Sequence, residues 1–281
     1  MSILNHKIDF VALVAVSMAN SNGDPLNGNR PRTDYNGLGE ISDVCVKRKI
    51  RNRMQDMQQR IFVQNDERCD DGYGSLSERA AATLGKIKKK DEYAQKACET
   101  WLDVRAFGQV FAFKSNEKSG VSVGVRGPVS IHQAVSVDPV DVVSMQITKS
   151  VNGEPGEKKS SDTMGTKHFV RFGLYKLTGS INVQLAEKTG FTEEDALVVK
   201  ECLRTLFCND ASSARPEGSM EVVKLYWFDH NCKDGQYSSA RVHRAVQASP
   251  REGIAVPASV DDYVITLEPL EGLVPEIIDG L

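Results

Sequence analysis

Residues Ile8 to Val16 form a nearly continuous apolar run that is rich in valine. A run of this length and β-branched content predicts a strand that is buried on both of its faces. Such a strand lies inside a sheet and is covered by a layer of structure on each side. The chain is therefore expected to fold around this strand.

A glycine- and asparagine-rich loop follows the strand, and a very basic helix follows the loop. The loop reads NSNGDPLNGNRPRTD from Asn20, and the helix contains VKRKIRNR from Val46. Such a loop exposes backbone N–H groups and amides, and the start of a helix adds a partial positive charge to the nearby guanidinium and ammonium groups. These groups suit a polyphosphate chain, so the pattern predicts a nucleic acid as the partner.

The basic helix also carries an apolar stripe within an arc of about 80°, which is expected to face the core. Its residues are Val46, Ile50, Met54, Met57 and Ile61. The basic residues are spread around the remaining surface, so they cannot all contact one ligand. A solvated basic face is the ordinary interpretation of such a helix, and the adjoining loop favours a binding role instead.

Composition excludes several classes of protein. The 281 residues are 40% hydrophobic and 26% charged, which is typical of a folded chain with one large domain or two small ones. No apolar run approaches the roughly 20 residues that span a bilayer, so we expect no membrane association. The 6 cysteines include no CxxC pair, so neither a disulfide framework nor a zinc finger is indicated, and a reducing cytoplasm is expected.

The formal net charge of −3 does not exclude a nucleic-acid partner, because binding depends on a local basic patch. Acidic residues gather at 66–71, 193–195 and 261–276, away from the basic helix in the sequence. With a screening length of about 8 Å, we expect these acids to leave the patch positive.

The middle of the chain predicts a helical segment followed by strands. Residues 65–103 contain helix formers and lysines, whereas 104–113 and 121–131 are strand-like. Two extended segments, 135–151 and 167–177, are separated by a polar stretch rich in Gly, Lys and Ser. This pattern predicts a long hairpin.

The second half begins with the best-defined helix start. Thr192 is a good N-cap and Asp195 stands where a capping box needs it, so a helix is expected to run to about Phe207. Strands are expected at 221–228 and 263–267. The whole order corresponds to the split βαββαβ plan of ferredoxin-like and RNA-recognition folds, in the α+β class. The aromatic signature that RNA-recognition sheets use for base stacking is absent, so binding through an open sheet face is not expected.

Enzymatic and metal-binding alternatives rest on few residues. Asp24 and Asp34 could activate a ribose hydroxyl or hold a metal, but shaping turns and pairing with Arg30 or Arg32 is the favoured interpretation. The 5 histidines form no HExxH motif, and Walker and GxSxG motifs are absent, so no metal, cofactor or nucleotide hydrolysis is expected.

Four blocks resemble one known family, in the family's order. They are NGDPLNGNRPRTD followed by SDVCVKRKIRNRM, Gly124 to Val151, Asp162 to Asp195, and Ser212 to Met220. They closely resemble the CRISPR-associated backbone subunit family of Cascade, in its type I-C form. The resemblance covers most of the chain and favours a binding role for the basic helix.

The resemblance implies a non-catalytic subunit and a particular assembly. Several copies would stack head to tail along one CRISPR RNA, beside other Cascade subunits, and present the guide for pairing with target DNA. Guide sequences vary, so contacts would go to phosphates and riboses. The chain would be one palm domain, 1–281, with an inserted helical lobe at about 62–103 and a thumb hairpin at about 137–170. The alternative is a type III-like backbone ribonuclease that cuts bound RNA through Asp24 or Asp34.

The predicted RNA contacts fall into four groups. The loop contributes Asn22, Asn29, Arg30 and Arg32. The helix contributes Lys47, Arg48, Lys49 and Arg51. The thumb contributes Lys149, Met164, Lys167 and His168. Arg215, in the loop after the capped helix, is either a phosphate contact or a surface arginine, and Met164 either fills the core or wedges between bases.

Overall fold

The structure is a computed structural model and describes residues 2–112, 122–148 and 164–281. The α-helices in these ranges are α1 (Asp43–Asp56), α2 (Leu76–Leu84), α3 (Lys90–Thr100), α4 (Leu102–Phe107), α5 (Val183–Thr189), α6 (Glu193–Arg204) and α7 (Ser239–Ala245). Short 3-10 helices are η1 (Pro25–Asn27), η2 (Asp66–Arg68) and η4 (Val260–Asp262). None of the helices in the described ranges is long and apolar enough to cross a membrane.

The strands in the first half of the chain are β1 (Ile8–Ala19), β2 (Gly23–Asp24), β3 (Arg30–Pro31), β4 (Leu38–Ile41), β5 (Gly108–Phe111), β6 (Val123–Arg126), β7 (Val129–Ile131) and β8 (Ala134–Pro139). The remaining strands are β9 (Val142–Thr148), β10 (Met164–Ile181), β11 (Met220–Asp229), β12 (Val246–Pro250), β13 (Tyr263–Leu267) and β14 (Glu276–Asp279). The main sheet has the order β14-β11-β1-β10-β8-β4, and β7 and β9 also pair with β10.

Strand β1 is the inner strand that the apolar run predicts. It pairs antiparallel with β10 on one side and with β11 on the other. Phe10, Ala12 and Val14 pack into a core shared with α1 and α6, whereas Val11 and Leu13 pack into a second core with α7 and β13. Both faces of the sheet are therefore covered at β1.

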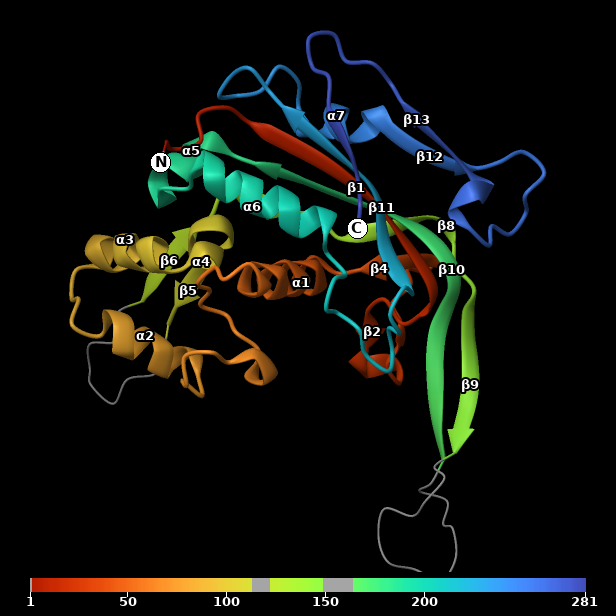
Figure 1. Cartoon of the computed structure of the whole chain (residues 1–281), viewed down its shortest axis with the longest axis horizontal. Coiled ribbons are helices and arrows are strands. Elements are labelled where there is room, and N and C mark those ends of the chain that lie inside the picture. The colour runs from red at the N-terminus through yellow and green to blue at the C-terminus, as the bar shows by residue number, and fades with distance from the viewer. Residues whose placement is uncertain (1, 113–121, 149–163) are drawn as a thin grey trace, which may run out of the picture.

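Helices α1 and α6 cover the same side of the sheet (Figure 1). The Ser42 side chain caps α1, and the stripe residues Val46, Ile50 and Met54 are buried, as predicted. Helix α6 begins with the predicted capping box between Thr192 and Asp195 and ends at Arg204, before the expected Phe207.

A separate apolar core lies in the lobe formed by α2, α3, α4 and the β5–β6 hairpin (Figure 1). The strand predicted at 104–113 is wrong for its first part, because α4 extends to Phe107 and β5 begins at Gly108. Val104 packs into the lobe core, whereas Leu102 and Ala106 pack into the core of the main sheet. A short helix buried on two sides gives a continuous apolar run, which periodicity does not distinguish from a strand.

The β9–β10 hairpin projects from the body of the molecule (Figure 1). Residues 142–148 pair antiparallel with residues 164–170, and β10 then continues into the main sheet beside β1. One strand is thus both the wall of the hairpin and a core strand, which fixes the hairpin base relative to the sheet. Lys149, a predicted thumb contact, lies outside the described residues.

Candidate nucleic-acid interface

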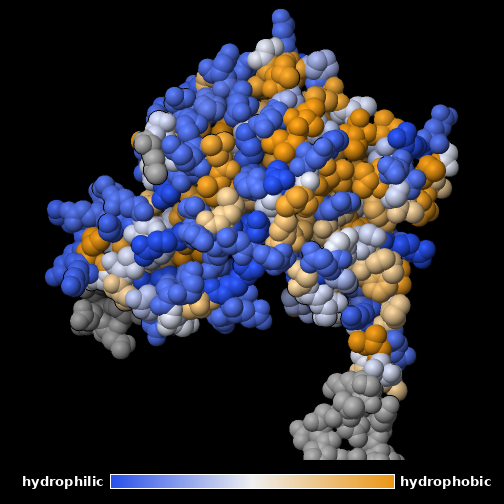
Figure 2. All heavy atoms as spheres, in the orientation of Figure 1, coloured by the Kyte–Doolittle hydropathy of each residue, from blue (hydrophilic) through white to orange (hydrophobic). Residues whose placement is uncertain are grey.

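A groove of about 270 Å³ lies where the end of β1 meets three other segments. We call it the loop–hairpin groove. It is lined by Met18 near the end of β1, Asn20 just after that strand, Gly28 and Asn29 of the glycine-rich loop, residues 166–169 of β10, and Ser213, Ala214 and Pro216 of the turn that precedes β11. In Figure 2 the molecule is hollowed between the helical lobe and the projecting hairpin.

The glycine- and asparagine-rich sequence shapes one wall of this groove. Asp24 Oδ1 accepts a hydrogen bond from Leu26 N and begins the short helix η1. Gly28 and Asn29 then adopt left-handed backbone angles, with φ of 58° at both residues, a conformation that Gly and Asn tolerate best. Asn20 Nδ2 donates to Asn29 O at 2.6 Å, which holds the loop across its own base.

Two polar contacts join the glycine-rich loop and the α6–β11 turn to the hairpin. Arg30 Nη1 donates to Ser144 Oγ at 2.9 Å, and Ser144 Oγ lies 2.9 Å from His168 Nδ1. Lys167 Nζ donates to Ser213 O at 3.0 Å. An ammonium group carries three donors, so this one contact leaves Lys167 able to bind a phosphate.

Asn22 and Arg32 lie at the base of the loop, where it meets α1. Asn22 Oδ1 accepts from Ser42 N at 2.9 Å, directly at the start of the helix. Arg32 Nη2 lies 3.5 Å from Asp24 Oδ1, and its Nε is buried without a hydrogen-bond partner in the described part of the chain. Asn22 therefore supports the loop, and Arg32 keeps a partly exposed guanidinium beside it.

The basic face of α1 is engaged inside the protein, contrary to the expectation that it supplies charge to the ligand. Lys49 contacts the Asp210 carboxylate and has a side chain only 4% exposed. Arg51 Nε donates to Asp103 Oδ2 at 2.9 Å, and its guanidinium lies over the Phe107 ring. Direct phosphate contacts by Lys49 and Arg51 do not fit these positions.

The other two basic residues of this group are partly engaged. Lys47 pairs with Asp43 at 2.9 Å, one helical turn away, and Arg48 Nη1 donates to Val63 O at 3.0 Å. The expectation that distant acids leave the patch positive fails because the fold brings Asp103 and Asp210 against α1. Burial lowers the pKa of the Lys49 ammonium, and Asp210 opposes this shift.

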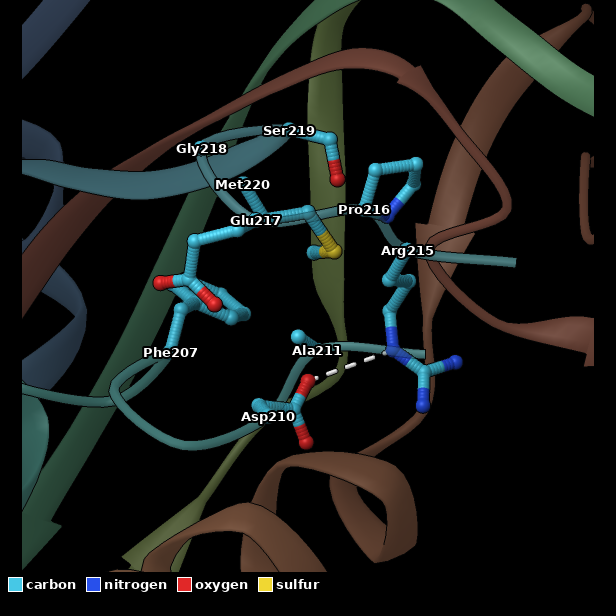
Figure 3. A pocket seen from close by; sticks show the side chains of 9 residues that line it. All are labelled: Phe207, Asp210, Ala211, Arg215, Pro216, Glu217, Gly218, Ser219 and Met220. Atoms are coloured by element: carbon cyan, nitrogen blue, oxygen red, sulfur yellow. Dashed lines mark hydrogen bonds and ion pairs between the residues drawn. The ribbon is translucent and has the colours of Figure 1, made fainter. Parts of the chain in front are cut away.

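Arg215 lies on the turn that lines the loop–hairpin groove. Its Nε donates to Asp210 Oδ2 at 3.2 Å, and Figure 3 shows the two terminal nitrogens pointing away from that carboxylate. A single carboxylate thus faces both Lys49 and Arg215.

Met164 lies toward the far end of the hairpin and is 58% exposed, so it does not fill the core.

Several residues in or beside the groove carry little signal in the sequence. Met18 is one of these, and it combines 53% exposure with a left-handed φ of 51°. Ser144 and Ser213 are ordinary serines whose roles depend on the pairing of distant segments.

Asp24 and Asp34, the carboxylates of the ribonuclease alternative, shape turns. Asp34 Oδ1 accepts from Asn36 N and Leu38 N, both at 2.8 Å, and Asp24 holds η1 and Arg32. Among the described residues, no group of three or more His, Cys, Asp or Glu side chains is arranged to hold a metal ion.

Comparison with known proteins assigns the family. Residues 6–268 match the family model of CRISPR-associated protein Cas7. The chain therefore belongs to the CRISPR-associated protein Cas7 family. The resemblance seen in the sequence is confirmed at this level, and its type I-C form stays a prediction.

Two relatives extend this result. A CRISPR-associated protein Cas7 of Haloferax volcanii is 25% identical over an alignment of 196 residues, and the match covers 63% of this chain and 56% of the relative. This chain thus spans little more than half the length of that curated relative. A solved chain described as a CRISPR RNA-guided surveillance complex, pre-nicking, has a TM-score of 0.52 and 17% identity, over 84% of this chain and 81% of that chain. At this identity the likeness is one of fold.

Proposed function

We propose that this protein is a non-catalytic backbone subunit of a type I-C CRISPR RNA-guided surveillance complex, and that it binds the sugar-phosphate strand of the CRISPR RNA in the loop–hairpin groove. The observation that carries the proposal is the convergence of three distant segments on that groove. Lys167 reaches across it to the Ser213 carbonyl, and Arg30 joins the loop to Ser144 of the hairpin beside it. Family membership supports the choice of RNA as the ligand.

The fold supports a palm and thumb arrangement. The strand order β11-β1-β10-β7 is the order that a βαββαβ unit produces, with α1 and α6 as its helices. In this interpretation residues 1–281 are one palm domain. The lobe at about 62–103 is inserted after α1, and the hairpin at about 137–170 is the thumb.

The groove chemistry fits a ligand whose sequence varies. Asn29 offers an amide, Lys167 an ammonium group, and the left-handed loop brings backbone groups close to the surface. These donors satisfy phosphate and ribose oxygens, which every nucleotide carries. The covered sheet leaves no open β-surface at β1 for base stacking, so base identity stays free to pair with target DNA.

Several copies of the protein are needed to cover one guide. Several copies on one RNA require a head-to-tail interface, which does not close and generates an open filament. Each copy would cover a short segment of guide, and other subunits of the complex would flank the filament.

Binding is tested with unstructured, labelled single-stranded RNAs of unrelated sequence. We expect similar affinity for each RNA, with the logarithm of affinity falling by about 0.7 per phosphate contact per decade of salt. Lys167→Met should reduce this slope by about one contact. Lys233→Met is the matched control, because Lys233 pairs with Glu187 away from the groove.

Two outcomes would contradict the proposal. One is affinity that depends strongly on base sequence. The other is a salt slope that is unchanged in Lys167→Met but is lost in the double variant Lys47→Met with Arg51→Met. That result would place the RNA strand along α1.

The ribonuclease alternative has its own test. Assembled protein is incubated with complementary RNA and magnesium, and the RNA is examined for regularly spaced cuts. We expect intact RNA. Cuts that disappear in Asp34→Ala would establish the alternative and exclude a non-catalytic role.

A further inference from the structure

The turn between α6 and β11 connects the loop–hairpin groove to a partly buried ion cluster. Its residues Ser213, Ala214 and Pro216 line the groove, and Arg215 between Ala214 and Pro216 contacts Asp210. Asp210 in turn contacts Lys49 of α1. The same short segment therefore touches the candidate ligand site and the core helix.

The backbone of this turn is fixed from several directions. Ser212 and Arg215 exchange backbone hydrogen bonds of 2.8 and 3.1 Å. Asn20 N donates to Ala214 O at 2.9 Å, and Lys167 Nζ donates to Ser213 O. Asn209, just before Asp210, has a left-handed φ of 56°, and Arg68 Nη2 donates to its carbonyl at 3.2 Å. Hydrogen bonds from within the protein thus hold the backbone of the turn in place.

The Asp210 carboxylate orients the Arg215 side chain. Of the Arg215 nitrogens only Nε donates to it, and Lys49 Nζ contacts the same oxygen, Oδ2. Within the described residues the terminal nitrogens of Arg215 have no hydrogen-bond partner, and they point away from Asp210 in Figure 3. A guanidinium held through Nε presents its two remaining donors as a fork that matches phosphate oxygens.

We propose that Asp210 is a positioning residue of the RNA site: anchored by Lys49, it holds Arg215 so that its terminal nitrogens bind one phosphate of the strand. This inference rests on the proposed function and adds which residue orients the Arg215 side chain. It also assigns Lys49 a role. Lys49 anchors the positioning carboxylate and does not touch the ligand.

The sign of the effect separates positioning from simple electrostatics. Removing a carboxylate near a polyanion raises the local positive potential, which by itself strengthens binding. A positioning role predicts the opposite, because an unanchored Arg215 loses its orientation. Asp210→Ala should therefore weaken binding although it adds net positive charge.

A double-mutant cycle on RNA affinity tests this inference, with labelled oligouridylate as the probe and the full chain as the protein. We expect Arg215→Ala to weaken binding about 10- to 100-fold, the range of a charged hydrogen-bonding pair. Asp210→Ala should lose a similar factor, and the double variant should be no weaker than Arg215→Ala alone. Asp279→Ala is the control, because Asp279 pairs with Lys224 at the edge strand β14 and should leave affinity unchanged.

Each other outcome overturns the inference. Stronger binding in Asp210→Ala would make the residue a simple repulsive charge. An equal loss from Asp210→Ala with and without Arg215 would make its role structural. If wild-type protein binds oligouridylate but Arg215→Ala binds equally well, the inference fails while the proposed function stands. Absence of wild-type binding would remove the proposed function itself.

Discussion

The basic face of α1 and the loop–hairpin groove differ in how their polar groups are satisfied. On α1, Lys49 is buried against Asp210, and the partly buried Arg51 pairs with the buried Asp103. In the groove, Lys167 is exposed and donates to one backbone carbonyl, Ser213 O. The region with more positive residues in the sequence is therefore the one with less charge to offer a ligand.

This difference shows that pairing, more than residue count, decides where a polyanion binds. A buried pair holds its partners strongly, because breaking it leaves an unpaired charge in a poorly solvated place. An exposed ammonium can exchange one weak acceptor for a phosphate at little cost. The charges of α1 contact the lobe and the α6–β11 turn, whereas Lys167 in the groove is available to a ligand.

The largest expected effect is on stability, from Asp103→Ala. The Asp103 carboxylate accepts from Arg51 Nε and from the backbone N–H groups of Phe62 and Val63. Its removal should lower the free energy of unfolding by about 3 to 5 kcal/mol, as for a buried pair that loses one member. Urea unfolding measures the change. RNA affinity of the folded variant should stay near wild type.

The matched control is Asp43→Ala, which removes the partly exposed partner of Lys47. The change in unfolding free energy should be below about 1 kcal/mol. If the two substitutions cost the same, or if Asp103→Ala mainly weakens RNA binding, the contrast between the two regions is wrong.

A reciprocal pair of arginine substitutions sharpens the comparison. Arg30→Met should weaken RNA binding about tenfold with little loss of stability, because Arg30 contacts Ser144 beside the groove. Arg51→Met should lower stability and leave the affinity of the folded protein unchanged. Anisotropy titrations and urea unfolding of both variants separate the two effects, and exchanged results would place the strand on α1.

The smallest expected effect is the pH dependence of an α1 ion pair. Burial raises the pKa of Asp56, but hydrogen bonds from Arg68 and Arg53 outweigh burial and lower it below its ordinary value of 3.8. The Asp56 carboxylate therefore stabilises the fold above about pH 4, and this contribution is lost as the pH falls through the folded pKa.

Asp56→Asn should make the loss of stability between neutral and acidic pH smaller than in wild type. Unfolding free energies at about pH 6 and about pH 3 measure this difference. An unchanged or steeper loss would mean that the pairing at Asp56 contributes nothing to the fold.

Local patterns predicted much of the fold. The apolar run of β1, the stripe of α1 and the capping box of α6 depend on neighbouring residues, so the sequence alone predicts them. The long hairpin was likewise expected from two extended segments around a polar stretch. In contrast, the apolar run that begins at Val104 predicts a strand where α4 lies, because this helix is apolar on two sides.

The candidate site was only partly predictable. The partners of Arg51 and Lys49 lie 52 and 161 residues away in the sequence, and no local pattern indicates pairing over such separations. Asn29, Arg30, Lys167 and His168 were predicted and do come together near one groove. Ser144 and Ser213 were missed, because a serine acquires such a role only through the register of distant strands.

Photo-cross-linking of RNA that contains 4-thiouridine, followed by mass spectrometry of the adducts, tests the location of the strand most directly. The account predicts adducts in the segments that line the loop–hairpin groove, at residues 18–29, 166–169 and 213–216. Adducts confined to the outer face of α1, with none in these segments, would contradict it.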